Sequence, residues 1–162
     1  QYAIHDELCE VRCDLFTTIA RQKSFQKPLI AVWTTTTRTL ESLPYVWVLI
    51  DDWQKNIFFD EETRCYRERV THNIDRQKAS EYVSDITFSN NACFFSCTLY
   101  IYPWFQFRVI DQLITNFHLP KSSVIMLVAG YVWYQEMHTI YKHAITQEYR
   151  FFSFGDGMLV MQ

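Results

Sequence analysis

Glycine is scarce in this sequence: only three of its 162 residues are glycine, at positions 130, 155 and 157. Few turns can therefore rely on the residue that most readily adopts positive φ angles. No apolar stretch reaches the roughly 18 residues that a membrane-spanning helix needs, and no signal peptide is visible, so we expect no membrane partner. Internal repeats are also absent, and the threonine run at 34–37 is the only low-complexity segment.

Neither the charge nor the cysteine count indicates a specialised class of protein. The chain has 15 basic and 18 acidic side chains, and the resulting net charge of −3 argues against nucleic-acid binding by overall charge attraction. This net charge does not exclude a local basic patch. The chain has five cysteines, and an odd number is not typical of a disulfide framework. Two pairs of them have C-x-x-x-C spacing, whereas zinc sites more often use C-x-x-C. Reduced thiols are favoured over metal ligands, and we expect a cytoplasmic protein.

Helical and strand-like patterns alternate along the chain. Apolar residues at helical spacing predict an amphipathic helix over 8–24, and the continuous run from Leu29 to Val32 predicts a strand buried on both faces. Residues 51–75 are charged and are interpreted as an irregular surface excursion. Further helices are predicted over 75–84, 122–132 and 135–147, and further strands over 98–102, 107–114, 149–153 and 158–160.

These elements predict a single α/β domain over residues 1–162, with a hydrophobic fraction of 49% that is enough for a full core. Because crossovers between parallel strands are right-handed, helices are expected on both faces of the sheet. The expected architecture is a three-layer α/β/α sandwich of Rossmann-like type with a mixed, largely parallel sheet. Since the chain begins at Gln1 without a methionine, we interpret it as a piece of a longer polypeptide.

The segment 111–123 carries an unusual density of reactive side chains, namely an acid, an amide, a histidine, a lysine and several hydroxyls. The Leu119-Pro120 step disfavours helical geometry just before an apolar run that predicts a helix. Ser122 or Ser123 therefore sits at the N-cap, where free backbone N–H groups suit an anion.

Four segments occur in a recognisable order: His5-Asp6-Glu7, AVWTTTTRTLES at 31–42, YIYPWFQFRVIDQLITNFHLPKSS at 100–123 and YKHAITQEYRFFSFGDGML at 141–159. Together they resemble the C-terminal half of the S-adenosylmethionine:tRNA ribosyltransferase-isomerases of queuosine synthesis. The resemblance covers nearly the whole chain and is weakest between 51 and 97, which we interpret as a variable surface region. It implies the C-terminal portion of a two-domain enzyme whose small β-barrel domain is missing here.

The resemblance also implies a reaction with two substrates. The ribosyl part of S-adenosylmethionine is transferred to 7-aminomethyl-7-deazaguanine at the wobble position of tRNAs with queuosine-type anticodons. It is isomerised to an epoxy-cyclopentanediol, which gives epoxyqueuosine, while adenine and methionine leave. S-adenosylmethionine is a co-substrate, and no metal, redox cofactor or prosthetic group is needed. We expect a monomer whose partners are tRNA and S-adenosylmethionine.

The proton transfers of this reaction require a general base and a general acid with pKa values near neutral. His118 is the first candidate, because imidazole needs the least adjustment of its pKa. Asp111 is the second, as a base or as the group that orients one. His5 and Glu7 are the third pair, in a motif that reads His-Ser-Glu in the family and has Asp6 in the middle here.

Other residues match positions of the family that would contact substrates. Arg38 would bind a carboxylate or phosphate through two hydrogen bonds, and Tyr102 would stack on a base. The full set of expected substrate contacts is Thr34, Thr35, Arg38, Tyr102, Thr115, Asn116, Lys121, Ser122, Arg150 and Asp156. The alternatives are structural roles: His118 bonded to a carbonyl, Asp111 capping a turn, and Arg38 in a surface ion pair with Glu41.

Four tryptophans depart from the family pattern. Trp33, Trp104 and Trp133 stand where the family has glycine, and Trp47 is assigned to the same group. Tryptophan supplies neither positive φ nor close backbone approach. One hypothesis is that UGA codons, which some bacteria read as glycine, have been translated as tryptophan. The alternatives are a non-catalytic tRNA- or nucleotide-binding relative whose pocket is blocked by Trp33 and Trp104, and an unrelated α/β nucleotide-binding enzyme.

Overall fold

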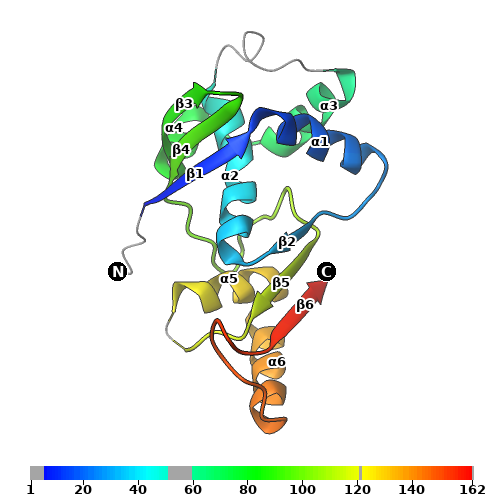
Figure 1. Cartoon of the computed structure of the whole chain (residues 1–162), viewed down its shortest axis with the longest axis vertical. Coiled ribbons are helices and arrows are strands. Elements are labelled where there is room, and N and C mark those ends of the chain that lie inside the picture. The colour runs from blue at the N-terminus through cyan, green and yellow to red at the C-terminus, as the bar shows by residue number, and fades with distance from the viewer. Residues whose placement is uncertain (1–5, 51–59, 121, 162) are drawn as a thin grey trace.

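The protein folds into helices packed around two small sheets (Figure 1). The computed structural model describes residues 6–50, 60–120 and 122–161. The first sheet is antiparallel in the order β1-β4-β3, with β1 at Glu7–Arg12, β4 at Ala92–Cys97 and β3 at Val83–Ser89. The second has the order β2-β5-β6, with β2 at Ile30–Val32, β5 at Gln112–Asn116 and β6 at Gly157–Met161. In it β2 is parallel to β5, and β6 is antiparallel to β5.

The described residues contain six helices: α1 at Cys13–Ser24, α2 at Thr34–Leu49, α3 at Glu61–Thr71, α4 at Arg76–Tyr82, α5 at Ser123–Val132 and α6 at Tyr134–Thr146. Three of the helices begin at a side chain that accepts a backbone N–H, as N-cap residues do. Asp60 accepts the N–H of Thr63, Asp75 that of Lys78, and Ser122 that of Ile125. Of the two serines predicted as the N-cap of α5, the structure uses Ser122.

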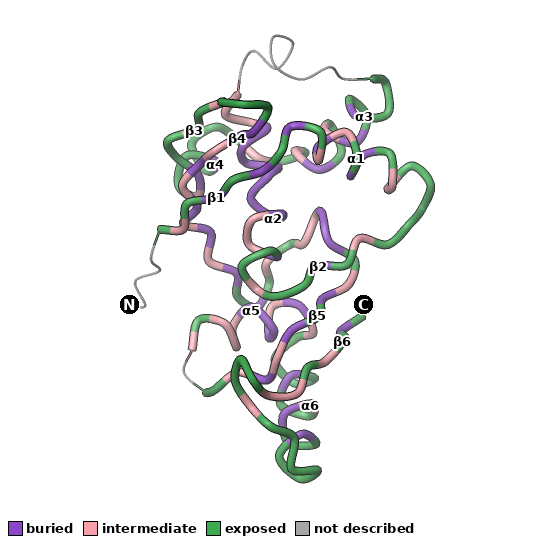
Figure 2. Tube along the Cα trace, in the orientation of Figure 1, coloured by how far each residue is buried: buried purple, intermediate pink, exposed green. Residues whose placement is uncertain are grey.

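Helix α2 forms the centre of the core and runs between the two sheets (Figure 1). Most of its middle is buried (Figure 2). The fully buried ring of Trp47 lies 5.3 Å from the ring of Phe16 in α1 and 5.8 Å from that of Tyr66 in α3. A smaller cluster of apolar side chains joins the end of β5 to α5 and α6, and it contains Phe117, Val128, Ala129, Met137, Tyr141 and Ala144.

A buried carboxylate ties α2 to the chain before β5. Glu41 accepts backbone N–H groups from Arg108 at 2.9 Å, Val109 at 3.0 Å and Ile110 at 2.9 Å. Desolvation by burial outweighs these bonds and raises the pKa of Glu41 to about 7. The alternative reading of a surface ion pair between Arg38 and Glu41 is therefore wrong, because Glu41 is buried and Arg38 pairs with Glu7.

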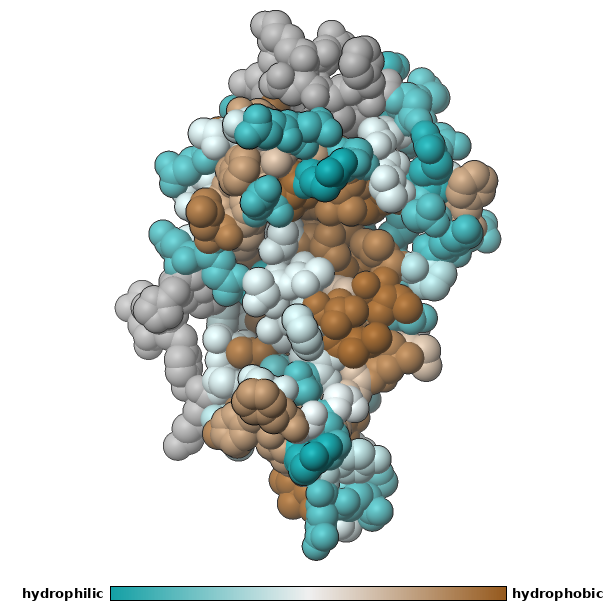
Figure 3. Space-filling model, viewed as in Figure 1, coloured by the Kyte–Doolittle hydropathy of each residue, from teal (hydrophilic) through white to brown (hydrophobic). Residues whose placement is uncertain are grey.

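One face of the second sheet is apolar and exposed to solvent (Figure 3). Along β2 the exposed side chains of Ile30 and Val32 flank buried Ala31, as the alternation of a strand with one buried face requires. The prediction that this strand is buried on both faces is therefore wrong. The neighbouring strands add Ile114, Leu159 and Met161 to the same face. The opposite face contributes Leu113 and Val160 to the core.

The mixed α/β class is confirmed, but the arrangement of strands differs from the expected one. Among the described strands, only β2 and β5 pair in parallel, and the strands form two sheets where one largely parallel sheet is predicted. The reason is visible between β3 and β4, which are joined by only two residues, Asn90 and Asn91. Both have positive φ, of 50° and 60°, as in the tight turns of antiparallel hairpins.

Several predicted boundaries also move. The expected helix over 8–24 starts only at Cys13, because β1 occupies Glu7–Arg12. The segment 98–102 and the segment 149–153 are not strands, and β6 pairs with β5. The described part of the expected irregular excursion over 51–75 contains helix α3, whose Tyr66 and Val70 belong to the core.

Candidate active site

A cavity of about 160 Å³ lies where β1, α2, the segment after β4 and α5 meet. Strand β1 contributes Glu7, and the first turns of α2 contribute Thr34, Thr35 and Arg38. The remaining walls come from Leu99, Tyr100, Ile101, Ser123, Val124 and Leu127. The cavity therefore brings together four of the residues predicted from sequence.

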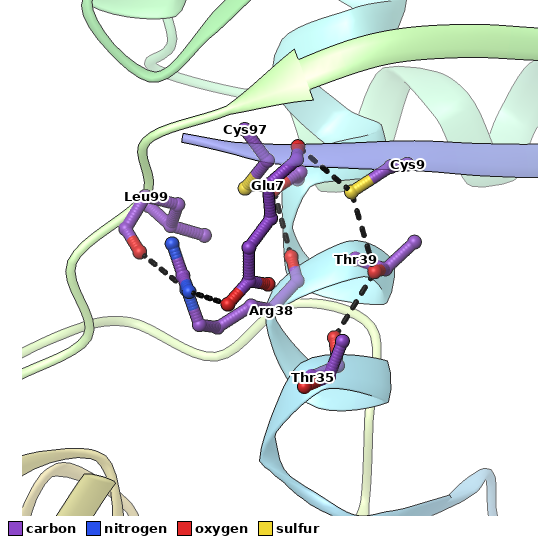
Figure 4. A network of polar contacts seen from close by, with 8 residues as sticks. Glu7, Cys9, Thr35, Arg38, Thr39, Cys97 and Leu99 are labelled. Atoms are coloured by element: carbon purple, nitrogen blue, oxygen red, sulfur yellow. Dashed lines mark hydrogen bonds and ion pairs between the residues drawn. The ribbon is translucent and has the colours of Figure 1, made fainter. Parts of the chain in front are cut away.

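Arg38 and Glu7 form the polar wall of this cavity (Figure 4). Arg38 Nη1 donates a hydrogen bond to Glu7 Oε1, and Arg38 Nε donates to the carbonyl oxygen of Leu99 at 3.0 Å. The Arg38 side chain is 14% exposed and that of Glu7 34%. Two further atoms, Arg38 Nη2 and Glu7 Oε2, are buried and have no hydrogen-bond partner among the described residues. A polar ligand in the cavity would supply such partners, since buried polar groups are normally hydrogen-bonded.

Two buried thiols lie behind this ion pair (Figure 4). Cys97 Sγ is 2.9 Å from Ser42 Oγ, and Cys9 Sγ is 3.5 Å from Thr39 Oγ1. The hydrogen bond between the thiols lowers the pKa of Cys97 and raises that of Cys9, to which burial adds. Within 6–50, 60–120 and 122–161, no group of three or more His, Cys, Asp and Glu side chains could hold a metal ion.

The cavity lies at the carboxyl edge of the parallel pair of strands. Val32 of β2 is aligned with Ile114 of β5, and the N–H of Trp33 donates to the carbonyl of Ile114 at 2.7 Å. Thr34 follows β2 and His118 follows β5, so both leave the sheet at the same edge. Ligands of open α/β sheets bind at this edge.

His118 is held by two hydrogen bonds just beyond β5. Its Nε2 lies 2.9 Å from Thr115 Oγ1, and its backbone N–H donates to the hydroxyl of Tyr141 at 3.1 Å. Burial lowers the pKa of His118, because desolvation disfavours the charged imidazolium. The side chain is therefore neutral at pH 7 and able to accept a proton.

The last motif forms a turn beside His118. Arg150 Nη2 pairs with Asp156 Oδ1 at 2.9 Å, and the backbone N–H of Arg150 donates to Asp156 Oδ2 at 2.7 Å. Asn116 Nδ2 donates to the carbonyl of Gly155 at 3.3 Å. These bonds hold the turn against the end of β5, so Asn116, Arg150 and Asp156 are grouped near His118. Neither these three residues nor His118 lines the cavity.

Asp111 lies at the opposite end of β5 from His118, although both are predicted from sequence to serve the same proton transfers. Its Oδ2 accepts hydrogen bonds from Lys23 Nζ at 2.5 Å and from the backbone N–H of Leu29 at 2.6 Å. A five-residue strand is about 17 Å long, so the strand itself separates the two side chains. Asp111 thus joins the chain before β2 to the chain before β5.

Asp111 also borders a second cavity of about 560 Å³ that is rich in basic side chains. Its other lining residues include Lys23, Lys27, Arg69 and Arg108. With four basic groups and one carboxylate, this surface is locally positive. It is a basic patch of the kind that the net charge of −3 does not exclude.

The remaining predicted residues have separate positions. Tyr102 is 44% exposed and its ring stacks on that of Tyr100, which lines the cavity, at 5.9 Å. His5 and Lys121 lie outside the described residues. Sequence reasoning missed Tyr100 and the carbonyl of Leu99. Their place beside Arg38 depends on long-range packing, although Tyr100 begins the YIYPWFQF segment and Leu99 precedes it.

Comparison with known proteins identifies the family. The sequence matches the family described as queuosine biosynthesis protein over residues 1–160. The chain belongs to this family. The S-adenosylmethionine:tRNA ribosyltransferase-isomerases of Rickettsia bellii (strain OSU 85-389) and Rickettsia canadensis (strain McKiel) are 31% and 32% identical to this chain over 160 residues. The match covers 99% of this chain but only 34% and 31% of those two relatives.

A solved structure is similar as well. The crystal structure of S-adenosylmethionine tRNA ribosyltransferase from Thermotoga maritima matches this chain with a TM-score of 0.65 and 27% identity. The match covers 95% of this chain and 40% of that chain. The family resemblance seen in the sequence motifs is thus confirmed. No helix in the described part of the chain is long and apolar enough to cross a membrane.

Proposed function

We propose that this chain is the C-terminal part of an S-adenosylmethionine:tRNA ribosyltransferase-isomerase. In the proposed reaction the ribosyl group of S-adenosylmethionine moves to the aminomethyl group of a deazaguanine at the tRNA wobble position and is isomerised, with loss of adenine and methionine. The observation that carries the proposal is the pair of unpartnered buried atoms, Arg38 Nη2 and Glu7 Oε2, on the cavity wall. The names of the relatives support the same reaction.

The cavity fits one part of S-adenosylmethionine. Its volume of about 160 Å³ is below the roughly 300 Å³ of a typical small-molecule site, so the rest of the longer protein would complete it. Arg38 Nη2 is a donor for the methionine carboxylate, and Glu7 Oε2 is an acceptor for a ribose hydroxyl or the methionine ammonium group. The carboxylate of Glu7 also favours a positively charged sulfonium nearby.

His118 is proposed as the general base. A neutral imidazole can take a proton from the aminomethyl nucleophile or from the carbon next to the sulfonium. The hydrogen bond to Thr115 occupies Nε2 and leaves Nδ1 as the atom that exchanges the proton. Asp111 is not part of this proposal, because its bonds to Lys23 and Leu29 give it a structural role.

Transfer RNA is proposed to contact the second cavity. The basic groups of Lys27, Arg69 and Arg108 suit phosphate oxygens, which supply most of the affinity in nucleic-acid complexes. Tyr102 is sufficiently exposed to stack on a base.

Release of adenine tests the proposal. The full-length protein is incubated with S-adenosylmethionine and tRNA that carries 7-aminomethyl-7-deazaguanine, and adenine is measured against a reaction without tRNA. Adenine that appears only with both substrates supports the proposal, whereas binding of both without adenine supports the non-catalytic alternative. Trp33 is 64% exposed and Trp104 lines a different cavity, so neither ring lines the site that the alternative requires to be blocked.

A further inference from the structure

Two tryptophans have backbone angles that are nearly exclusive to glycine. Trp33 has φ 70° and ψ 158°, and Trp133 has φ 68° and ψ 153°. A residue with a Cβ atom is strained in this region, because the side chain meets its own backbone. Trp104, with φ 76°, also has a positive φ angle. Each of these conformations costs of order 1–3 kcal/mol when the residue is not glycine.

The hydrogen bonds around these positions show that the chain needs this geometry. The carbonyl of Trp33 accepts the N–H of Thr37 at 3.1 Å and so starts helix α2 directly after β2. The carbonyl of Trp133 accepts the N–H of Met137 at 3.0 Å, at the junction of α5 and α6. Trp104 lies in a turn where the N–H of Phe105 donates to the carbonyl of Tyr102 at 2.9 Å.

The three side chains gain little from their surroundings. Trp33, Trp104 and Trp133 are 64%, 78% and 56% exposed, so most of each ring lies in solvent. Trp47 differs in both respects, since it is fully buried inside helix α2 and packs on Phe16 and Tyr66. The structure therefore separates Trp47 from the other three, although the family pattern groups all four.

Other residues with positive φ do not show the same combination. Four of the ten such residues that are not glycine are asparagine or aspartate, which tolerate the left-handed region, and Gln26 and Glu148 follow the ends of helices. Phe152, with φ 72°, is the one other bulky case, and nothing here accounts for it. None of the glycines has a positive φ among the described residues, so tryptophan stands where glycine is normally used.

We propose that positions 33, 104 and 133 are glycine in the protein that its own host makes, and that position 47 is tryptophan. UGA differs by one base from the tryptophan codon UGG and by one base from the glycine codon GGA. A host that reads UGA as glycine would place glycine at the three strained turns, whereas reading the same codons as tryptophan gives the sequence described here. This inference is independent of the proposed function, because it rests on backbone geometry and on the exposure of the four side chains.

The codons and the mass of the native protein test it directly. The proposal expects UGA at positions 33, 104 and 133 and UGG at position 47. Peptide masses of the protein purified from its own host should fit glycine at the first three positions and tryptophan at position 47. A UGG codon or a tryptophan-containing peptide at any of the three positions overturns the proposal.

Stability provides a second readout in a host that uses the standard code. In the full-length protein, Trp33→Gly and Trp133→Gly should each raise the Tm by about 3 °C. Trp33→Ala is the matched control, because it removes the ring but keeps a Cβ atom at the strained φ, and it should give less than half of that rise. Trp47→Gly should lower the Tm by about 10 °C through loss of buried ring contacts. If Trp33→Gly and Trp133→Gly lower the Tm as Trp47→Gly does, the proposal is overturned.

Discussion

Arg38 of helix α2 and Glu7 of strand β1 form an ion pair in which each side chain keeps one buried polar atom without a partner among the described residues. An unsatisfied buried polar group costs about 1–3 kcal/mol, so this pair is an unfavourable way to join a helix to a strand unless a ligand completes it. The ion pair of Arg12 and Asp14 offers a contrast, because its side chains are 73% and 54% exposed.

The first prediction concerns this pair. Arg38→Lys keeps the charge but removes the forked donor group, and Glu7→Gln removes the negative charge. Each change should raise the KM for S-adenosylmethionine in the adenine-release assay at least about tenfold, since charged hydrogen bonds contribute about 1.5–3 kcal/mol. Asp14→Asn is the matched control and should leave KM unchanged. An unchanged KM in Arg38→Lys would show that the cavity does not bind this substrate.

The second prediction concerns His118. Replacing a general base removes about a hundredfold or more of the rate, so His118→Ala should lower kcat by that factor while the far-UV circular dichroism stays the same. His72→Ala, at an exposed position after helix α3, serves as the control with full activity. A kcat within threefold of the unchanged protein would exclude His118 as the base.

The third prediction follows from the direction of the same pKa shift. Because burial lowers the pKa of His118 from 6.5, the neutral base is available at all pH values above 6.5. The acid limb of the pH profile of kcat/KM should therefore lie below pH 6.5 and disappear in His118→Ala. The stability that the neutral side chain contributes is present above the unfolded pKa and is lost as the pH falls through the lowered pKa. An acid limb centred above pH 7 would contradict this account.

The fourth prediction concerns Glu41, whose pKa shifts in the opposite direction. Its folded pKa of about 7 exceeds the unfolded value of about 4.3, so the unfolded state releases the proton first as the pH rises. Stability from this group is full below about pH 4.3 and is lost as the pH rises through about 7. Glu41→Gln should flatten this dependence in urea unfolding at pH 5 and pH 8.

The same substitution also disturbs the three backbone bonds. Glu41 Oε2 accepts the N–H of Arg108, and Oε1 accepts those of Val109 and Ile110. Glutamine keeps one oxygen for Val109 and Ile110, but its amide nitrogen cannot accept the N–H of Arg108, so Glu41→Gln should cost about 1–3 kcal/mol at pH 5. Glu10→Gln, on the exposed face of β1, should change neither the stability nor its pH dependence. Equal pH slopes in the two variants would mean that Glu41 has an ordinary pKa.

The fifth prediction concerns the close approach of α5 to the cavity wall. A Cβ atom at Gly130 would lie 2.7 Å from the carbonyl oxygen of Tyr102, so that Gly130→Ala pushes the segment 100–102 away. We expect a lower Tm and a higher KM for S-adenosylmethionine, although alanine has a helix propensity better by about 1 kcal/mol. Gly157→Ala is the control, because its nearest neighbour, the carbonyl oxygen of Thr115, is 3.5 Å away.

Two helices could be predicted from sequence, one from its serine N-cap and one from apolar residues at helical spacing. The predicted helix over 122–132 corresponds to α5 at Ser123–Val132, and that over 135–147 to α6 at Tyr134–Thr146. Strand β1 could not be recognised in the sequence, because its buried residues Cys9 and Val11 are followed without a break by the helical pattern of α1, which begins at Cys13. No turn residue separates the two periods.

The candidate site could be predicted only in part, for a similar reason. Thr34, Thr35 and Arg38 follow a predicted strand, which places them at its carboxyl edge without further knowledge. Asp111 and His118 are seven residues apart in sequence, and their separation depends on the strand that lies between them. The contact of Glu7 with Arg38 depends on pairing of β1 with β4, which is a long-range feature that local patterns do not encode.

The most direct test of the account is a crystal structure of the full-length protein with S-adenosylmethionine bound. We expect the methionine carboxylate or a ribose hydroxyl within about 3 Å of Arg38 Nη2 or Glu7 Oε2, at the carboxyl edge of β2 and β5. S-adenosylmethionine bound at the Asp111 end of β5, or away from both Arg38 and Glu7, would contradict the assignment of this cavity as the active site.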